Sequence, residues 1–282
     1  MVDADSDTAQ ITLSREGSLG FLSGILIGAA AGMIGVGGGE FRIPVLMHVL
    51  RLPVRIAAGA NTVIGLVVVV LGAIRRLPQH KWNEGDGTIV VAMGIASLAG
   101  AWLGARLANR IPIQPLKIFV IGYLAVVGVW MIVEAFLHVD HSLLDPTGVA
   151  RIVLAVVTGF AIAGVSGSLG VAGGEMRIPA LMYLFAMPIK QAGTISLLVS
   201  IPTVAASAVA YRRLGHIPNR VLAVAGIMGL GSVVGVLIGA ALLPYVDQHV
   251  LKGILGAILL LATACLLIPW TPQSPTRVPT KP

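Results

Sequence analysis

Charged residues embedded in apolar sequence are the first feature that could carry chemistry. Glu40 and Arg42 follow the run Gly-Val-Gly-Gly-Gly, and Glu175 and Arg177 follow a near copy of it. An ionisable side chain inside a membrane-type segment is a functional hypothesis by default. The guanidinium group is a planar fork of donors that suits oxyanions. These residues therefore predict contact with a small anion.

The glycine runs before these residues predict breaks in two helices. Glycine does not propagate a helix cheaply, and unpaired backbone groups at membrane depth must line a cavity or pair with protein. Segments that restart at Glu40 and Glu175 would offer free N–H groups and positive dipole ends, which bind anions. Pro44 and Pro179 would lie in or near the first turn, where proline is tolerated. We expect the two restarted helices to converge on one central site.

A set of candidate substrate-binding residues follows from these breaks and from the nearest polar side chains. The set is Gly38, Gly39, Glu40, Arg42, Gly173, Gly174, Glu175, Arg177, Asn61, Ser166, Ser168 and Ser196. Glu40 and Glu175 are open to three roles: capping a helix, pairing with an arginine, or carrying a proton that couples to transport. The structural alternative is that Glu–Arg ion pairs hold the broken helices together and that the hydroxyl groups only link helices.

Other kinds of chemistry find little support in the sequence. The glycine run lacks the Gly-Lys-Ser/Thr ending of a phosphate loop, and the six histidines show no metal-ligand spacing. No arrangement of nucleophile and base is visible. The net charge of +7 comes from short loops between apolar runs, without a basic stripe for nucleic acid. We therefore predict no enzyme, no metal, no cofactor and no nucleic-acid partner.

The elements that position these residues are apolar helices. The chain is 56% hydrophobic and 11% charged, with a mean hydropathy of +0.94, whereas soluble domains have about 25% charged residues. Long apolar runs indicate transmembrane helices. The expected segments are Leu19–Val36, Phe41–Leu50, Val54–Ile74, Thr88–Leu107, Pro115–Leu137, Gly148–Val171, Met176–Met187, Ile189–Tyr211, Val221–Leu243 and Val250–Ile268. The second segment of each half is long enough for only about half of a 30 Å membrane core.

The two halves are copies of one unit. Thirteen residues from Gly35 match thirteen from Gly170 at all but three positions, and the same offset of 135 recurs downstream. An odd number of crossings in each half would invert the second copy. This arrangement places 11 basic residues on one side and 6 on the other, with Arg76 and Lys252 counted among the six, against 10 and 7 for parallel copies. The positive-inside rule favours inverted repeats with the richer side cytoplasmic.

These observations predict an all-α polytopic membrane protein with two homologous, inverted repeats. About 8–10 transmembrane or re-entrant helices are expected, broken at the glycine-rich motifs. The expected parts are a polar N-terminal segment (1–18), a first transmembrane repeat (19–137), a linker (138–147), a second transmembrane repeat (148–270) and a disordered tail (271–282).

The duplicated motif also resembles that of a known family. The stretch Gly-x-Gly-Gly-Gly…Pro, followed by Leu52-Pro53 and then Asn61-Thr62, is similar to the TauE/SafE family of sulfite exporters, and the resemblance extends over Leu19–Ile268. It implies a multi-pass transporter of the inner cell membrane that carries sulfite or another sulfur-containing or organic anion. The form Gly-Gly-Glu-x-Arg-Ile-Pro is more charged than the family's general pattern, which leaves the substrate open.

The predicted function is secondary transport of a small anion, with rocking of the two halves as the motion and proton coupling as a hypothesis. The partners are the anionic substrate and the lipid bilayer, and self-association is left open. An anion channel would share the site but need no coupling. An intramembrane enzyme or lipid-handling protein would need a nucleophile or a metal set.

Overall fold

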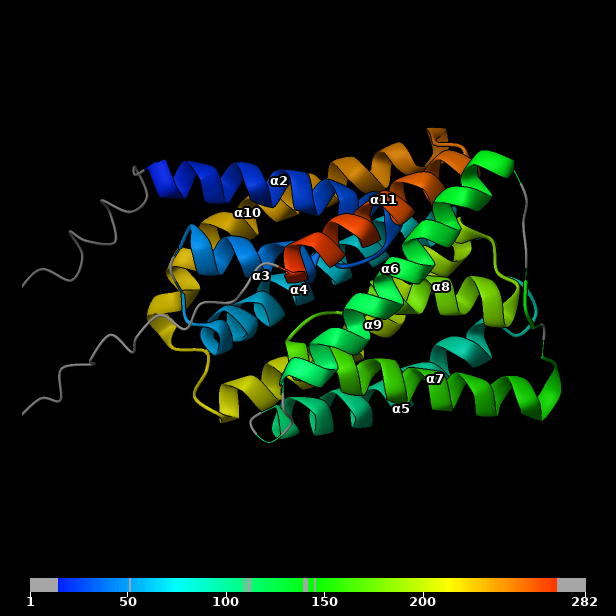
Figure 1. Cartoon of the computed structure of the whole chain (residues 1–282), viewed down its shortest axis with the longest axis horizontal. Coiled ribbons are helices and arrows are strands. Elements are labelled where there is room, and N and C mark those ends of the chain that lie inside the picture. Colours follow the sequence, from blue (N-terminus) through cyan, green and yellow to red (C-terminus); the bar gives the residue numbers. More distant parts are fainter. Residues whose placement is uncertain are drawn as a thin grey trace, which may run out of the picture.

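The structure, a computed structural model, is a bundle of helices (Figure 1). It describes residues 15–50, 52–108, 110, 113–138, 142–144 and 146–267. The first half of the chain contains α2 (Arg15–Ile34), α3 (Gly39–His48), α4 (Val54–Arg76), the 3-10 turn η1 (Leu77–Gln79), α5 (Asp86–Leu107) and α6 (Ile113–Leu137). The second half contains α7 (Gly148–Leu169), α8 (Gly174–Phe185), α9 (Ile189–Arg213), α10 (Asn219–Leu242), the 3-10 turn η2 (Leu243–Tyr245) and α11 (Gln248–Leu267).

The lengths of these helices confirm the predicted fold class. Eight of the described helices are long and apolar enough to cross a membrane. The other two, α3 and α8, have 10 and 12 residues, which at 1.5 Å per residue is about 15–18 Å. No strand occurs within the described ranges. The protein is therefore an all-α, multi-pass membrane protein with one short helix in each half.

The short helices begin at glycines whose backbone is left-handed. Gly38 precedes α3 with φ +73°, and Gly173 precedes α8 with φ +76°, a conformation that glycine adopts without steric cost. Each helix starts at the glycine before the expected glutamate, and Pro44 and Pro179 lie just beyond the first turn. Because proline has no N–H group, the carbonyl group four residues earlier loses its usual helical partner.

Each long helix of one half packs against a long helix of the other half. Helix α2 packs along α10, and α7 packs along α5 in the same way, while α4 packs against α9 and α6 against α11. In each half the first helix therefore pairs with the fourth helix of the other half. This reciprocal exchange is the pattern expected of two copies related by a pseudo-two-fold axis. The direction of the second copy remains a prediction.

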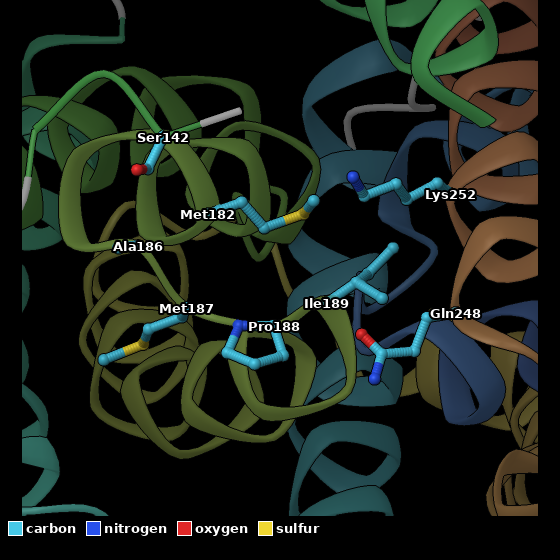
Figure 2. A pocket seen from close by; sticks show the side chains of 8 residues that line it. All are labelled: Ser142, Met182, Ala186, Met187, Pro188, Ile189, Gln248 and Lys252. Atoms are coloured by element: carbon cyan, nitrogen blue, oxygen red, sulfur yellow. The ribbon is translucent and has the colours of Figure 1, made fainter. Parts of the chain in front are cut away.

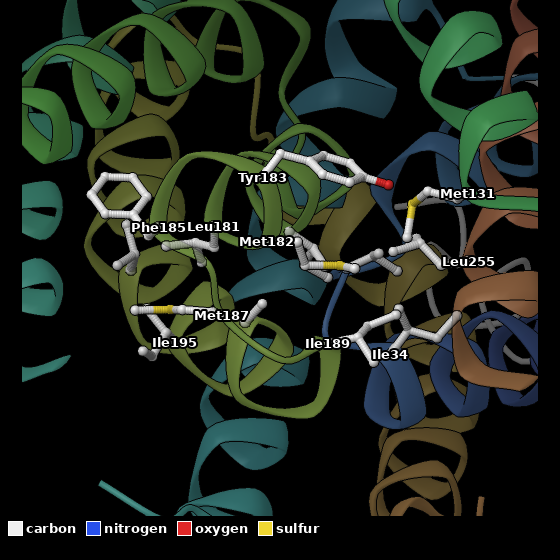
Figure 3. Packing of buried hydrophobic residues seen from close by; sticks show 14 of the residues in the cluster. Ile34, Met131, Leu181, Met182, Tyr183, Phe185, Met187, Ile189, Ile195 and Leu255 are labelled. Carbon is white, nitrogen blue, oxygen red and sulfur yellow. The ribbon is translucent and has the colours of Figure 1, made fainter. Parts of the chain in front are cut away.

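An apolar core surrounds α8 and the start of α9. Leu181, Met182 and Phe185 of α8 lie next to Ile195 of α9 (Figure 3), and Leu255 of α11 belongs to the same buried cluster. The outer face is also apolar: Leu26, Phe136 and Val149 are 72%, 80% and 76% exposed, respectively. Large apolar side chains on the outside are what a lipid-facing surface requires. The short helix α8 is thus held inside the bundle, away from lipid.

Some sequence-based predictions fall on other parts of the chain. Residues 1–14 of the expected polar N-terminal segment and the whole expected tail, 271–282, lie outside the described residues. Residues 139–141 and 145 of the expected linker do so as well. The predicted boundaries of these segments therefore stay predictions.

Candidate functional site

The two helix breaks lie in direct contact. A Cβ atom added to Gly174 would lie 2.5 Å from the carbonyl oxygen of Val36, and one added to Gly37 would lie 2.6 Å from the Cβ of Ala172. The first of these contacts is with a backbone atom, which cannot move aside by a change of side-chain rotamer. The N-terminal ends of α3 and α8 therefore meet, as the duplicated glycine runs predict.

This contact can be tested with one methyl group. Gly174→Ala should destabilise the protein by roughly 1–3 kcal/mol, because the added carbon overlaps the backbone of the opposite break. The measurement is the midpoint of thermal unfolding of the purified protein in detergent. Gly164→Ala is the matched control, since its Cβ would have only the Gly100 oxygen near it, at 3.9 Å. Equal midpoints for the two variants would contradict the contact.

Each break is also tied to the opposite half by a polar side chain. Asn61 Nδ2 donates to the carbonyl oxygen of Gly170 at 2.7 Å, and Ser196 Oγ donates to that of Gly35 at 3.2 Å. Asn61 and Ser196 are equivalent positions, as are the two glycines. Both side chains were predicted to bind substrate, and that role stays a prediction; in the structure they link the two halves. Asn61 Oδ1 has no hydrogen-bond partner among the described residues.

The helices that lead into the breaks are capped by buried side chains. Arg76 is fully buried, and its Nη1 lies 3.4 Å from the carbonyl oxygens of Gly32 and Met33 at the end of α2. At the equivalent place in the second half, the Tyr211 hydroxyl donates to the carbonyl oxygen of Ser168 at 3.0 Å. A cation at a helix C-terminus complements the helix dipole. Arg76, which was counted as a loop charge, is instead an internal cap.

The two predicted serines of α7 differ in position. The Ser166 side chain is buried beside the second break, because a Cβ on Gly173 would lie 2.7 Å from its Oγ. Ser168 Oγ instead donates to the carbonyl oxygen of Val165 in its own helix at 2.7 Å. Ser166 Oγ also donates within α7, to the carbonyl oxygen of Ala163 at 3.4 Å, so the two serines differ in that only Ser166 is shown at the break.

The two glutamates lie against each other at the junction. The carboxyl groups of Glu40 and Glu175 interact with each other, and Glu175 is only 3% exposed. Two ionised carboxylates at such a site repel, so the pair favours a state in which one of them holds a proton. Among the described residues, neither Arg42 nor Arg177 forms an ion pair with its neighbouring glutamate. The structural alternative, in which Glu–Arg ion pairs hold the breaks together, is not what the geometry provides.

The two arginines are equivalent in sequence but not in environment. Arg177 Nη1 donates to the carbonyl oxygen of Ser196 at 3.2 Å and to Ser200 Oγ at 2.7 Å, and its Nη2 donates to Thr203 Oγ1 at 3.3 Å. Arg42 is also fully buried, yet none of its three guanidinium nitrogens has a hydrogen-bond partner in the described part of the chain. In the described part of the chain, the second half thus provides partners for both terminal nitrogens of its arginine, though not for Nε, and the first half provides none.

The cause of this difference is visible in the repeat. The positions equivalent to Ser200 and Thr203 are Gly65 and Val68, which have no hydroxyl group. A Cβ on Gly65 would lie 3.7 Å from Arg42 Nη1, so the guanidinium group does reach α4 there. A buried cation without hydrogen bonds is costly. Arg42 is therefore the group at this junction that a small anion would satisfy best.

A second buried charge cluster was missed by sequence reasoning. Lys252 of α11 forms an ion pair with Glu134 of α6 at 3.0 Å, and the same carboxylate accepts from Trp130 Nε1 at 2.9 Å and from the Tyr183 hydroxyl at 3.2 Å. Lys252, like Arg76, was counted as a loop charge. The signal was a glutamate in an apolar helix whose potential partner lies 118 residues away, so spacing alone did not connect them.

A bundle of membrane-spanning helices with two broken helices meeting at a buried, charged centre has the architecture of a membrane transporter. A family model described as "Sulfite exporter TauE/SafE" matches residues 154–282. The second half of the chain therefore resembles the TauE/SafE family of sulfite exporters, in agreement with the resemblance of the duplicated motif.

Curated relatives agree with this assignment. The chain is 24% identical over 229 residues to the probable membrane transporter protein YdhB of Bacillus subtilis (strain 168), covering 80% of this chain and 90% of the relative. It is 27% identical over 256 residues to YjnA of the same organism, also named a probable membrane transporter protein, covering 86% and 96%. A probable membrane transporter protein of Xylella fastidiosa (strain 9a5c) is 35% identical over 86 residues, which is 30% of this chain and 32% of the relative. No solved structure matches the chain.

Proposed function

We propose that this protein is a proton-coupled secondary transporter of a small oxyanion, with sulfite as the first candidate. The observation that carries the proposal is the Arg42 guanidinium, which is fully buried near the junction of the two breaks and has no hydrogen-bond partner among the described residues. A small oxyanion offers two acceptor oxygens to such a fork. The description of the matching family as sulfite exporters supports the choice of anion.

The binding site would combine Arg42 with the backbone at the starts of the two short helices. The backbone N–H groups of residues 38–40 and 173–175 lie at the N-caps and in the first turns of α3 and α8, where no earlier carbonyl group of the same helix can pair with them. Helix starts are also the positive ends of their dipoles. Two such ends and one guanidinium provide donors on several sides of a small anion.

The Glu40–Glu175 pair would couple the anion to a proton. With the shared proton in place, the pair carries one negative charge next to the cationic site. Loss of that proton would add a second negative charge and repel the bound anion. Anion and proton would therefore bind cooperatively and move together, because each favours the state that holds the other.

Alternating access would come from rocking of the two halves around this junction. The reciprocal packing of α2 on α10 and of α7 on α5 supports a pseudo-two-fold relation, and the basic-residue bias supports inverted copies. The junction would stay central while the helix pairs exchange which end is open.

A flux assay tests this proposal. Purified protein in proteoliposomes should accumulate at least one of sulfite, thiosulfate, sulfate or a small carboxylate when an inward proton gradient is imposed, and a protonophore should abolish the accumulation. Protein-free liposomes provide the control for leak. If the flux does not depend on the proton gradient and electrical recordings show unitary currents, the protein is instead an anion channel. No flux of any of these anions in either condition would contradict the proposal.

The same assay separates coupling from binding. Glu175→Gln should keep exchange of internal for external anion but lose accumulation driven by the proton gradient, because an amide cannot release a proton. Glutamine preserves the size of the side chain, so exchange also reports that the protein is folded. Accumulation by the variant equal to that of the unmodified protein would remove the glutamates from coupling.

A further inference from the structure

A polar cavity of about 510 Å³ lies at one end of the helix bundle, outside the junction of the breaks. Its walls come from η1 and the following loop, from the first turns of α9 and the proline before it, and from the connection between α10 and α11 with the first residue of α11. The lining residues are Gln79, His80, Lys81, Pro188, Lys190, Gln191, Thr194, Leu243, Pro244 and Gln248. We call this cavity the vestibule.

The charge of the vestibule is positive. Lys81 and Lys190 line it, and none of its lining residues is acidic. Asp86, a buried acid beside the lining residue His80, is already engaged: its Oδ2 accepts from the Asn83 backbone N–H at 2.9 Å and lies 3.4 Å from His80 Nε2. Asp247, next to the lining residue Gln248, accepts from the backbone N–H of His249 at 2.8 Å. Two lysines therefore face this space without a carboxylate among the lining groups.

The floor of the vestibule leads to the first break. Thr194 lines the cavity, and its Oγ1 accepts from Arg76 Nε at 3.2 Å. Arg76 Nη2 also donates to the carbonyl oxygen of Lys190 at 2.8 Å, while its Nη1 reaches the end of α2. A third cation thus lies directly behind the cavity and immediately before the glycine break that follows α2.

A smaller pocket adjoins the vestibule and extends its polar surface. It has a volume of about 180 Å³ and shares Pro188 and Gln248 with the vestibule. Figure 2 shows Gln248 and Lys252 on α11 on one side of this pocket, with Met182 on the other. The Lys252 amino group is committed to Glu134. The free charge that an incoming anion would meet is therefore that of Lys81 and Lys190.

We infer that the vestibule is an outer binding site for the transported anion, where Lys81 and Lys190 collect it before it passes Arg76 to the junction. This inference rests on the proposed anion transport and adds the route by which the anion enters. A cavity lined by charge of one sign raises the local concentration of the opposite ion and its rate of association. The vestibule would thus act on capture, not on the movement of the loaded carrier.

Initial rates of sulfite uptake at a series of sulfite concentrations test this role. Lys81→Gln combined with Lys190→Gln should raise KM by about 10-fold and leave the maximal rate unchanged, because only capture is weakened. The KM of the unmodified protein should also rise with ionic strength, and that dependence should be smaller in the variant. Arg75→Gln is the matched control, since Arg75 is an exposed cation at the same end that does not line the cavity.

The outcomes separate this inference from the proposed function. If the unmodified protein takes up sulfite and the double variant has the same KM and salt dependence, the vestibule does not bind the anion. A fall in the maximal rate with unchanged KM would equally contradict a capture role. If the unmodified protein itself moves none of the anions named above, the proposed function fails first. A KM shift of the same size in Arg75→Gln would reduce the effect to general surface charge and overturn the inference.

Discussion

Replacing Arg42 with glutamine is expected to lower anion uptake by at least about 100-fold while leaving the protein folded. A hydrogen bond to a charged group contributes about 1.5–3 kcal/mol, and a bidentate contact would lose two of them. Arg42 makes no hydrogen bond to the described residues, so its replacement by glutamine breaks no internal hydrogen bond and removes a buried charge. The measurement is sulfite uptake in proteoliposomes, with thermal unfolding in detergent as the check on folding.

The same substitution at Arg177 should have a different profile. Arg177→Gln removes donors from Ser200 Oγ, Thr203 Oγ1 and the Ser196 carbonyl oxygen. Leaving buried acceptors unpaired costs roughly 1–3 kcal/mol, so this variant should unfold at lower temperature. The two variants form a matched pair at equivalent positions of the repeat. Loss of uptake in Arg177→Gln with full uptake in Arg42→Gln would reverse the assignment of the binding arginine.

Much of this architecture is predictable from sequence because it follows from composition and from duplication. Long apolar runs give the eight long helices, and the glycine runs before Glu40 and Glu175 give the two breaks. The offset of 135 also explains why the breaks meet, since copies of one unit pack reciprocally. The expected helices agree with the observed ones to within a few residues.

The details that distinguish the two halves are not predictable in this way. Arg76 has the sequence of a loop charge beside Arg75, and only packing decides that one is buried and the other exposed. Asn61 and Ser196 differ in chemistry, yet each holds the glycine carbonyl of the opposite break. These partners lie far apart in the sequence and meet only through the tertiary fold. The spacing of residues along one helix does not predict such contacts.

The residues that make the environments of Arg42 and Arg177 different can be read from the sequence. Their effect on the two arginines cannot be inferred from the sequence alone. Gly65 and Val68 are ordinary residues of an apolar helix, and their equivalents Ser200 and Thr203 could equally have been helix-linking hydroxyls. Only the position of Arg177 against those hydroxyls shows what Arg42 lacks. The first repeat is thus the one whose buried guanidinium has no hydrogen-bond partner among the described residues, which is why we propose it as the group that binds the anion.

Restoring the missing hydroxyl should therefore close the site. Gly65→Ser is expected to raise the KM for the anion by about 10-fold or more, because the new Oγ would accept from Arg42 as Ser200 accepts from Arg177, a bond of about 1.5–3 kcal/mol. The side chain fits: a Cβ at this position would lie 3.7 Å from Arg42 Nη1 and 3.7 Å from Val204 Cγ1, which are ordinary contacts. Uptake kinetics in proteoliposomes measure the effect.

Gly65→Ala separates the hydroxyl group from the added carbon, since it places the same Cβ without an acceptor. It should transport like the unmodified protein, whereas Gly65→Ser should lose affinity and unfold at the same or a higher temperature. Adding Val68→Thr to Gly65→Ser reproduces in the first half the hydroxyl groups of the second half and should weaken affinity further, because Thr203 also contacts Arg177.

Equal KM values for the serine and alanine variants would mean that the Arg42 guanidinium group does not bind the anion. A loss of affinity accompanied by lower stability would point to misfolding of α4 and not to competition for Arg42. Lower affinity with preserved stability is the result that only a ligand-binding Arg42 produces.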